Sequence, residues 1–147
     1  MKTIWIIIVF ICGALLPLQI GFNAKLGKSI GSPLYSALIC FIVGVVAMGL
    51  YIPFTKESIT WTGLKSASTL SLLGGGLIGA FFITASMLAM PRIGMALTFA
   101  LVVTGQVIIA ALLDHFNILV GQQHSINVGR LVGITLIITG VIIVGKY

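Results

Sequence analysis

Long runs of apolar residues with almost no charge inside them dominate this sequence. A membrane-spanning helix needs about 20 mostly apolar residues, and each run is long enough to provide one. Arg130 stands in the first turn of the last run. The sequence therefore predicts an all-α integral membrane protein with five transmembrane helices. The expected helices cover approximately residues 3–24, 32–54, 67–90, 93–114 and 127–146.

The composition excludes most other classes of protein. Of the 147 residues, 59% are hydrophobic and 7% are charged, whereas a soluble domain carries about 25% charged residues. A soluble enzyme, a soluble binding module and a disordered chain are therefore excluded. The apolar runs are continuous, while the strands of a membrane barrel alternate between apolar and polar residues. We expect residues 1–147 to form a single transmembrane domain.

The charged residues point to lipid and not to nucleic acid. Eight Lys and Arg residues stand against two acids, giving a net charge of +6. They stand singly between apolar runs, where they anchor helix ends among lipid headgroups; nucleic-acid binding needs a clustered basic face. Cys12 and Cys40 have neither CxxC spacing nor a His at ligand spacing. We therefore expect no metal, no cofactor and no nucleic-acid partner.

The distribution of basic residues leaves the membrane orientation open. With five spans, four basic residues fall on each side of the membrane, so the rule that Lys and Arg face the cytoplasm gives no answer. Either a few residues, such as Lys25 and Lys28, decide the orientation, or the chain inserts both ways. In the second case a homodimer of antiparallel copies would reproduce the inverted repeat of many transporters.

A tight turn is expected between the third and fourth helices. Pro91 and Arg92 form the only break between these two apolar runs. Proline lacks a backbone N–H and clashes with the preceding turn of a helix. The sequence therefore places the hairpin turn at Pro91–Arg92.

Polar side chains inside the expected spans are the candidates for a binding site. Gln19 and Asn23 are four residues apart and share one helix face, and Gln106 is stacked below Phe99 at helical spacing. Polar groups within a membrane are costly and frequently functional. We expect these four residues, with Phe22, to bind the substrate. The alternative is a hydrogen bond between helices, typically worth about 1 kcal/mol.

Two further sets of residues suggest a gate and an interface. Asp114 and His115 end the fourth helix, where the helix dipole opposes an acid; they are candidates for a proton-linked gate, or for a surface pair with a Lys or Arg. Small residues mark close helix packing in membranes. Gly133, Gly140 and Gly145 on the fifth helix therefore predict a dimer interface, with packing inside the subunit as the alternative.

Several motifs together resemble the YdcZ-like inner-membrane protein family. They are QIGFNAKLG at residues 19–27, GSPL at 31–34, PRIGMA at 91–96, VTGQ at 103–106 and DHF at 114–116. The resemblance implies a five-helix, single-repeat branch of the drug/metabolite transporter superfamily in the bacterial inner membrane. Small multidrug transporters of that superfamily use a Glu in their first helix. Here no acid occurs between Lys2 and Thr55, and Gln19 stands in that helix instead. A neutral, zwitterionic or anionic solute is therefore at least as compatible as an organic cation.

The expected function follows from these observations. The spans contain no paired carboxylates, and the chain has no GxSxG or HExxH motif, so we expect no enzyme. The prediction is a secondary transporter of a small solute that works as a dimer by alternating access. Two alternatives remain open: a channel for a small solute or ion, and a non-transporting factor that assembles beside another membrane protein.

Overall fold

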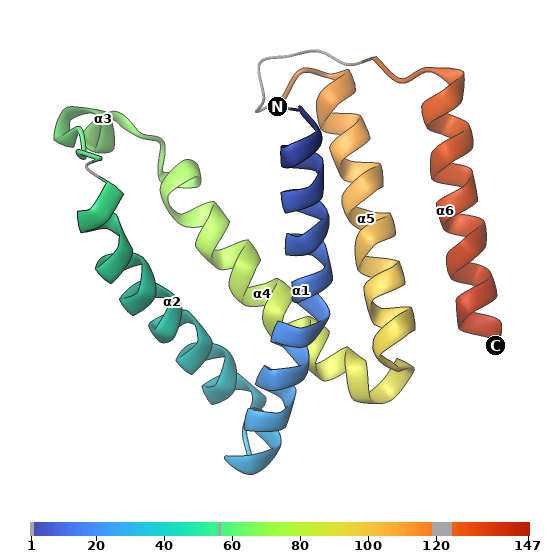
Figure 1. Cartoon of the computed structure of the whole chain (residues 1–147), viewed down its shortest axis with the longest axis horizontal. Coiled ribbons are helices and arrows are strands. Elements are labelled where there is room, and N and C mark those ends of the chain that lie inside the picture. The colour runs from blue at the N-terminus through green and yellow to red at the C-terminus, as the bar shows by residue number, and fades with distance from the viewer. Residues whose placement is uncertain (1, 56, 119–124) are drawn as a thin grey trace. The chain divides into compact units, whose positions relative to one another are not determined.

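The computed structural model describes residues 2–55, 57–118 and 125–147. The regular structure of these residues is helical (Figure 1). The helices are α1 (Lys2–Ser29), α2 (Pro33–Thr55), α3 (Trp61–Ser66), α4 (Thr69–Ile93), α5 (Met95–His115) and α6 (Val128–Lys146). All except α3 are long and apolar enough to cross a membrane, which makes five candidate spans. The prediction of an all-α membrane protein with five such helices is confirmed.

The spanning helices are apolar on most of their surface, and little of that surface is covered within the chain. The share of each span buried inside the chain lies between 0% for α6 and 17% for α4. A helix that is hydrophobic all round needs an apolar environment. Lipid or another subunit must therefore cover most of these helices.

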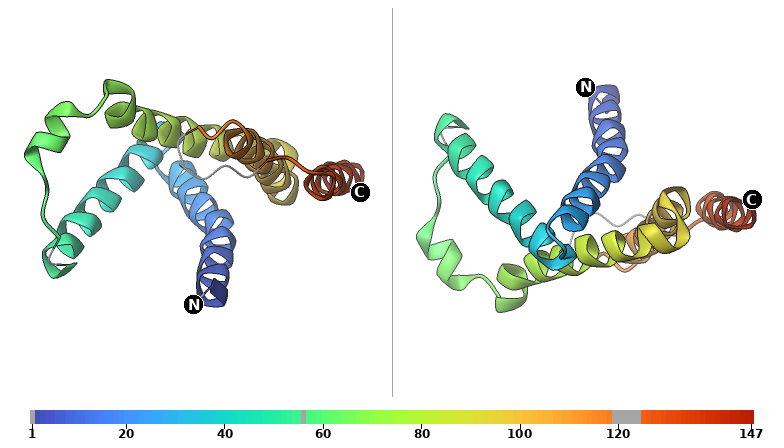
Figure 2. Two further views of the ribbon diagram at one scale, coloured as in Figure 1. Left: turned by 90° about the horizontal axis from the view of Figure 1, so that it is seen from above. Right: turned by 90° about the horizontal axis from the view of Figure 1, so that it is seen from below.

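The chain forms two compact units, residues 1–89 and 90–147. In the first unit, α1 and α2 are joined by a short turn containing Gly31, whose positive φ of 73° suits glycine. The two helices are closest near this turn and diverge away from it (Figures 1 and 2). A Cβ atom on Gly27 would lie 3.2 Å from Cα of Pro33. The missing side chain of Gly27 therefore allows the close approach.

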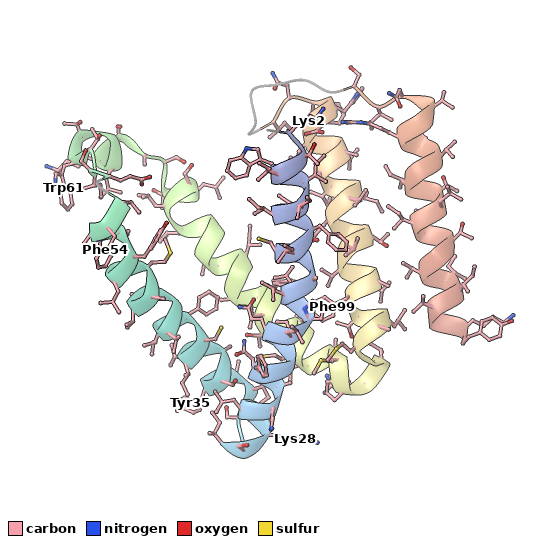
Figure 3. The ribbon with its side chains drawn as sticks, in the orientation of Figure 1. Lys2, Lys28, Tyr35, Phe54, Trp61 and Phe99 are labelled. Atoms are coloured by element: carbon pink, nitrogen blue, oxygen red, sulfur yellow. The ribbon has the colours of Figure 1, made fainter. Side chains whose placement is uncertain are left out.

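Basic and aromatic residues lie at both ends of the α1–α2 pair. Lys2, Phe54 and Trp61 lie at one end, and Lys28 and Tyr35 at the other (Figure 3). Phe54 is 83% exposed and Trp61 is 66% exposed. Aromatic and basic side chains are typical of the membrane–water interface. The ends of α1 and α2 are therefore suited to the two interfaces.

The first unit differs from the sequence expectation in two elements. The helix α1 continues to Ser29, so Asn23 lies inside the helix, and Lys25 and Lys28 belong to its last turns and not to a loop. The short helix α3, which carries Trp61 and Lys65, was not predicted. Six residues are too few to produce a recognisable helical period.

The predicted turn at Pro91–Arg92 is wrong. Pro91 lies inside α4, and the chain turns at Gly94, where φ is 83°. Proline removes only one backbone bond from the last turn of α4, and membrane helices tolerate this. A positive φ favours glycine, because glycine has no Cβ. The conformation of Gly94, and not the ring of Pro91, therefore sets the turn.

In the second unit, α5 and α6 run antiparallel and side by side (Figure 1). A Cβ atom on Gly145 would lie 3.3 Å from Cδ1 of Leu97, so this glycine packs against α5. Asn127 precedes α6, and its Oδ1 accepts a hydrogen bond of 2.9 Å from the backbone N–H of Arg130. This N-cap satisfies one of the free N–H groups at the start of α6.

Candidate functional site

Three contacts, each one turn further along α1, join it to α2. Gly27 faces Pro33, as described above. The hydroxyl of Ser36 donates a hydrogen bond of 2.6 Å to the backbone carbonyl of Asn23. At the third step, Nε2 of Gln19 lies 3.6 Å from Sγ of Cys40 and donates to it. The first unit therefore places Gln19 and Asn23 on the face of α1 that meets α2.

Asn23 is a buried amide without a full set of partners. Its side chain is 9% exposed, and Nδ2 is buried without a hydrogen-bond partner in the described chain. A buried donor left without an acceptor costs about 1–3 kcal/mol. Such a cost in a spanning helix is typical of a functional position.

Gln19 is exposed on the same face as Asn23. Its amide donates to a thiol, which is a weak acceptor, so a stronger acceptor could readily replace Cys40. Phe22, predicted to take part in the same site, is 71% exposed. The described contacts give Phe22 no role in joining α1 to α2.

Ser36 is the residue that sequence analysis missed. It is fully buried, and its hydroxyl joins α2 to the backbone of α1. The available signal was spacing: Ser36 and Cys40 are four residues apart, like Gln19 and Asn23, and an antiparallel hairpin brings two such pairs together.

The helix α4 also buries a polar group. In the first unit, the ring of Phe41 on α2 would contact a Cβ atom on Gly79 of α4 at 3.7 Å. Further along α4, Ile83, Ser86 and Met87 are buried, and their spacing places them on one helix face. Ser86 is 5% exposed. The buried surface of α4 is therefore apolar with one hydroxyl.

In the second unit, the predicted residues Phe99 and Gln106 both lie on α5. Phe99 is half-buried and Gln106 is exposed. They are seven residues apart and so share a face of the helix. A cavity common to these two residues and to Gln19, Phe22 and Asn23 of the first unit stays a prediction.

Asp114 and His115 connect α5 to the start of α6. Oδ2 of Asp114 lies 3.3 Å from Nη1 of Arg130 in an ion pair. Nδ1 of His115 accepts a hydrogen bond of 3.3 Å from the backbone N–H of Ile126. Arg130 is thus the basic partner that the alternative reading of Asp114 required. The proton-linked gate stays a prediction.

The three glycines predicted for a dimer interface differ in their surroundings. A Cβ atom on Gly133 or Gly140 would meet nothing within 4 Å, whereas Gly145 faces Leu97 of α5. Gly145 is therefore a packing position inside the subunit. Gly133 and Gly140 remain candidates for contact with a second copy.

Comparison with known proteins agrees with this architecture. Residues 4–143 match the family described as "Putative inner membrane exporter, YdcZ". No curated protein and no solved structure matches the chain. The match covers all five spanning helices apart from the ends of α1 and α6. The chain belongs to the YdcZ family and is an integral protein of the inner membrane.

Proposed function

We propose that the protein is a secondary transporter that exports a small solute as a dimer by alternating access. The observation that carries the proposal is the amide of Asn23, which is buried in a spanning helix without a partner for Nδ2. A purely structural amide would be expected to complete its hydrogen bonds. The family description, an inner membrane exporter, supports transport and its outward direction.

The dimer is supported by how little the helices cover one another. No more than 17% of any span is buried inside the chain, and Gln19 and Gln106 are exposed on spanning helices. An exposed amide is unfavourable against lipid, so a second copy that completes a polar path would stabilise both residues. We assign Gly133 and Gly140 of α6 to the interface, because both face open space.

A stability screen tests the proposal. A ligand that binds only the folded state raises the melting temperature by mass action. The purified protein would be heated with neutral, zwitterionic, anionic and cationic metabolites, and we expect one class to stabilise it. Gln106→Leu should reduce this shift, whereas Thr135→Val should not, because the Thr135 hydroxyl donates to the carbonyl of Leu131 in its own helix.

Flux measurements in proteoliposomes then separate the alternatives. For a transporter, uptake of the stabilising compound saturates, and unlabelled compound inside the vesicles accelerates it. Flux that neither saturates nor exchanges would instead identify a channel. Failure of every class of metabolite to shift the melting temperature would contradict transport and favour a non-transporting assembly factor.

A further inference from the structure

We propose that the amides of Gln19 and Asn23 bind a carboxylate group of the transported solute, so that carboxylates are the substrate class. This inference rests on the proposed function, because it names the chemistry of the same solute. It depends on hydrogen-bond donors that lack good acceptors and on the charges around them.

The first donor is the amide of Asn23. Nδ2 carries two N–H groups, is buried and has no acceptor within the described chain. The only hydrogen bond of this residue outside its helix is the one that its backbone carbonyl accepts from Ser36. The amide is therefore free to turn about Cβ–Cγ, a soft torsion. A half-turn would exchange Nδ2 and Oδ1 and present the donor to a ligand without separating α1 from α2.

The second donor is the amide of Gln19, one helical turn away. Its Nε2 donates to Sγ of Cys40 over 3.6 Å. A carboxylate oxygen accepts hydrogen bonds far more strongly than a thiol, so exchange of Cys40 for a carboxylate is favourable. The two amides are separated by a rise of about 6 Å along the axis, which lets their side chains converge on one carboxylate.

The charges of this hairpin also favour an anion. No acid occurs between Lys2 and Thr55, and the charged residues of α1 are all lysines. Lys25 follows Asn23 by two residues, and Lys28 lies in the last turn of α1. A cationic group bound beside Asn23 would find no counter-charge on α1 or α2, and an unpaired charge in a membrane is costly. An anion would meet two donor amides near the basic end of α1.

The test compares three small aromatic compounds of similar size. Benzoate offers two acceptor oxygens and a negative charge, benzamide is neutral, and benzylammonium is a cationic donor. Each would be added to the full chain in detergent while the melting temperature is followed. We expect benzoate to raise it most, benzamide less and benzylammonium not at all.

Alkylation of the two cysteines gives a local measurement of the same event. Cys40 contacts Gln19, whereas Cys12 is exposed on α1 about two turns before Gln19. We expect benzoate to slow the reaction of N-ethylmaleimide with Cys40 more than with Cys12. The ratio of the two rates, measured by mass spectrometry, separates binding at Gln19 from a general effect on the micelle.

Variants of Asn23 separate binding from folding. Asn23→Leu should weaken benzoate binding about tenfold or more, as expected for a lost hydrogen bond to a charged group. Without ligand it should melt at the same or a higher temperature, because it removes a buried donor that has no acceptor. A purely structural role of Asn23 would instead lower that temperature. Gln19→Leu, at an exposed position, repeats the binding test where misfolding is not at issue, and Thr135→Val is the control on α6.

Asn23→Asp tests the sign of the charge. The new carboxylate should abolish the benzoate shift and create one for benzylammonium. The inference is overturned if benzylammonium stabilises the unaltered protein as well as benzoate does. It is equally overturned if none of the three compounds binds, or if benzoate binds Asn23→Leu and Gln19→Leu unchanged. In each of these cases the transporter proposal still stands if the metabolite screen and counterflow succeed, so the two failures are distinguishable.

Discussion

At the scale of single residues, the approach of α1 to α2 depends on a missing side chain. Gly27 is buried, and the atoms nearest to its place for a Cβ belong to the backbone of Pro33. Backbone atoms cannot rotate aside as the tip of a flexible side chain can. A methyl group at this position must therefore push the two helices apart.

Gly27→Ala is expected to destabilise the protein by about 1–3 kcal/mol, the usual range for overpacking. Gly13→Ala, in the same helix, is the matched control because nothing lies within 4 Å of its place for a Cβ. It should be neutral or stabilising by up to about 1 kcal/mol, since alanine favours helices over glycine. Reversible unfolding in mixed detergent and SDS micelles measures both. Equal stability of the two variants would contradict the close packing at Gly27.

The residues of this crossing were only partly predictable. The spacing of four between Gln19 and Asn23 fixes their common face in any helix, so sequence alone could pair them. The hydrogen bond from Ser36 to the carbonyl of Asn23 depends on the register of the hairpin. That register follows from the turn around Gly31 and the contact of Gly27 with Pro33, which no single-residue pattern reveals.

At the scale of helices, the number of spans was predictable and their ends were not. Lipid requires each span to satisfy its own backbone groups, so five apolar runs give five helices. The ends depend on local conformation instead. The helix α1 continues through Lys25 and Lys28 to Ser29, because nothing before Gly31 forces the chain out of helical geometry.

The turn between α4 and α5 tests which residue breaks a helix here. Gly94→Ala places a side chain at φ 83° and should destabilise the protein by about 1–3 kcal/mol through backbone strain. Pro91→Ala should cost little, because Pro91 already lies within α4. Gly105→Ala serves as the control, at an unhindered position inside α5. A larger loss of stability for Pro91→Ala than for Gly94→Ala would restore the turn to Pro91.

At the scale of the whole molecule, the balance of basic residues bears on assembly. Five spans place Lys2, Lys56, Lys65 and Arg130 on one side of the membrane, and Lys25, Lys28, Arg92 and Lys146 on the other. An antiparallel dimer needs both orientations of one chain. A four-to-four balance would permit this, because the distribution of Lys and Arg sets orientation.

Reporters fused to the C-terminus measure the orientation directly. Green fluorescent protein reports a cytoplasmic C-terminus, and alkaline phosphatase reports an external one; we expect strong signals from both. Lys25→Gln with Lys28→Gln leaves four basic residues against two, so the N-terminal side should become cytoplasmic and the phosphatase signal should dominate. Lys2→Gln with Lys65→Gln should produce the opposite bias. Each biased variant alone should lose counterflow, and co-expression of the two should restore it, because only the mixture supplies both halves of an antiparallel dimer. A single fixed orientation of the unaltered chain, or full transport by one biased variant alone, would show that the subunits do not pair in this way.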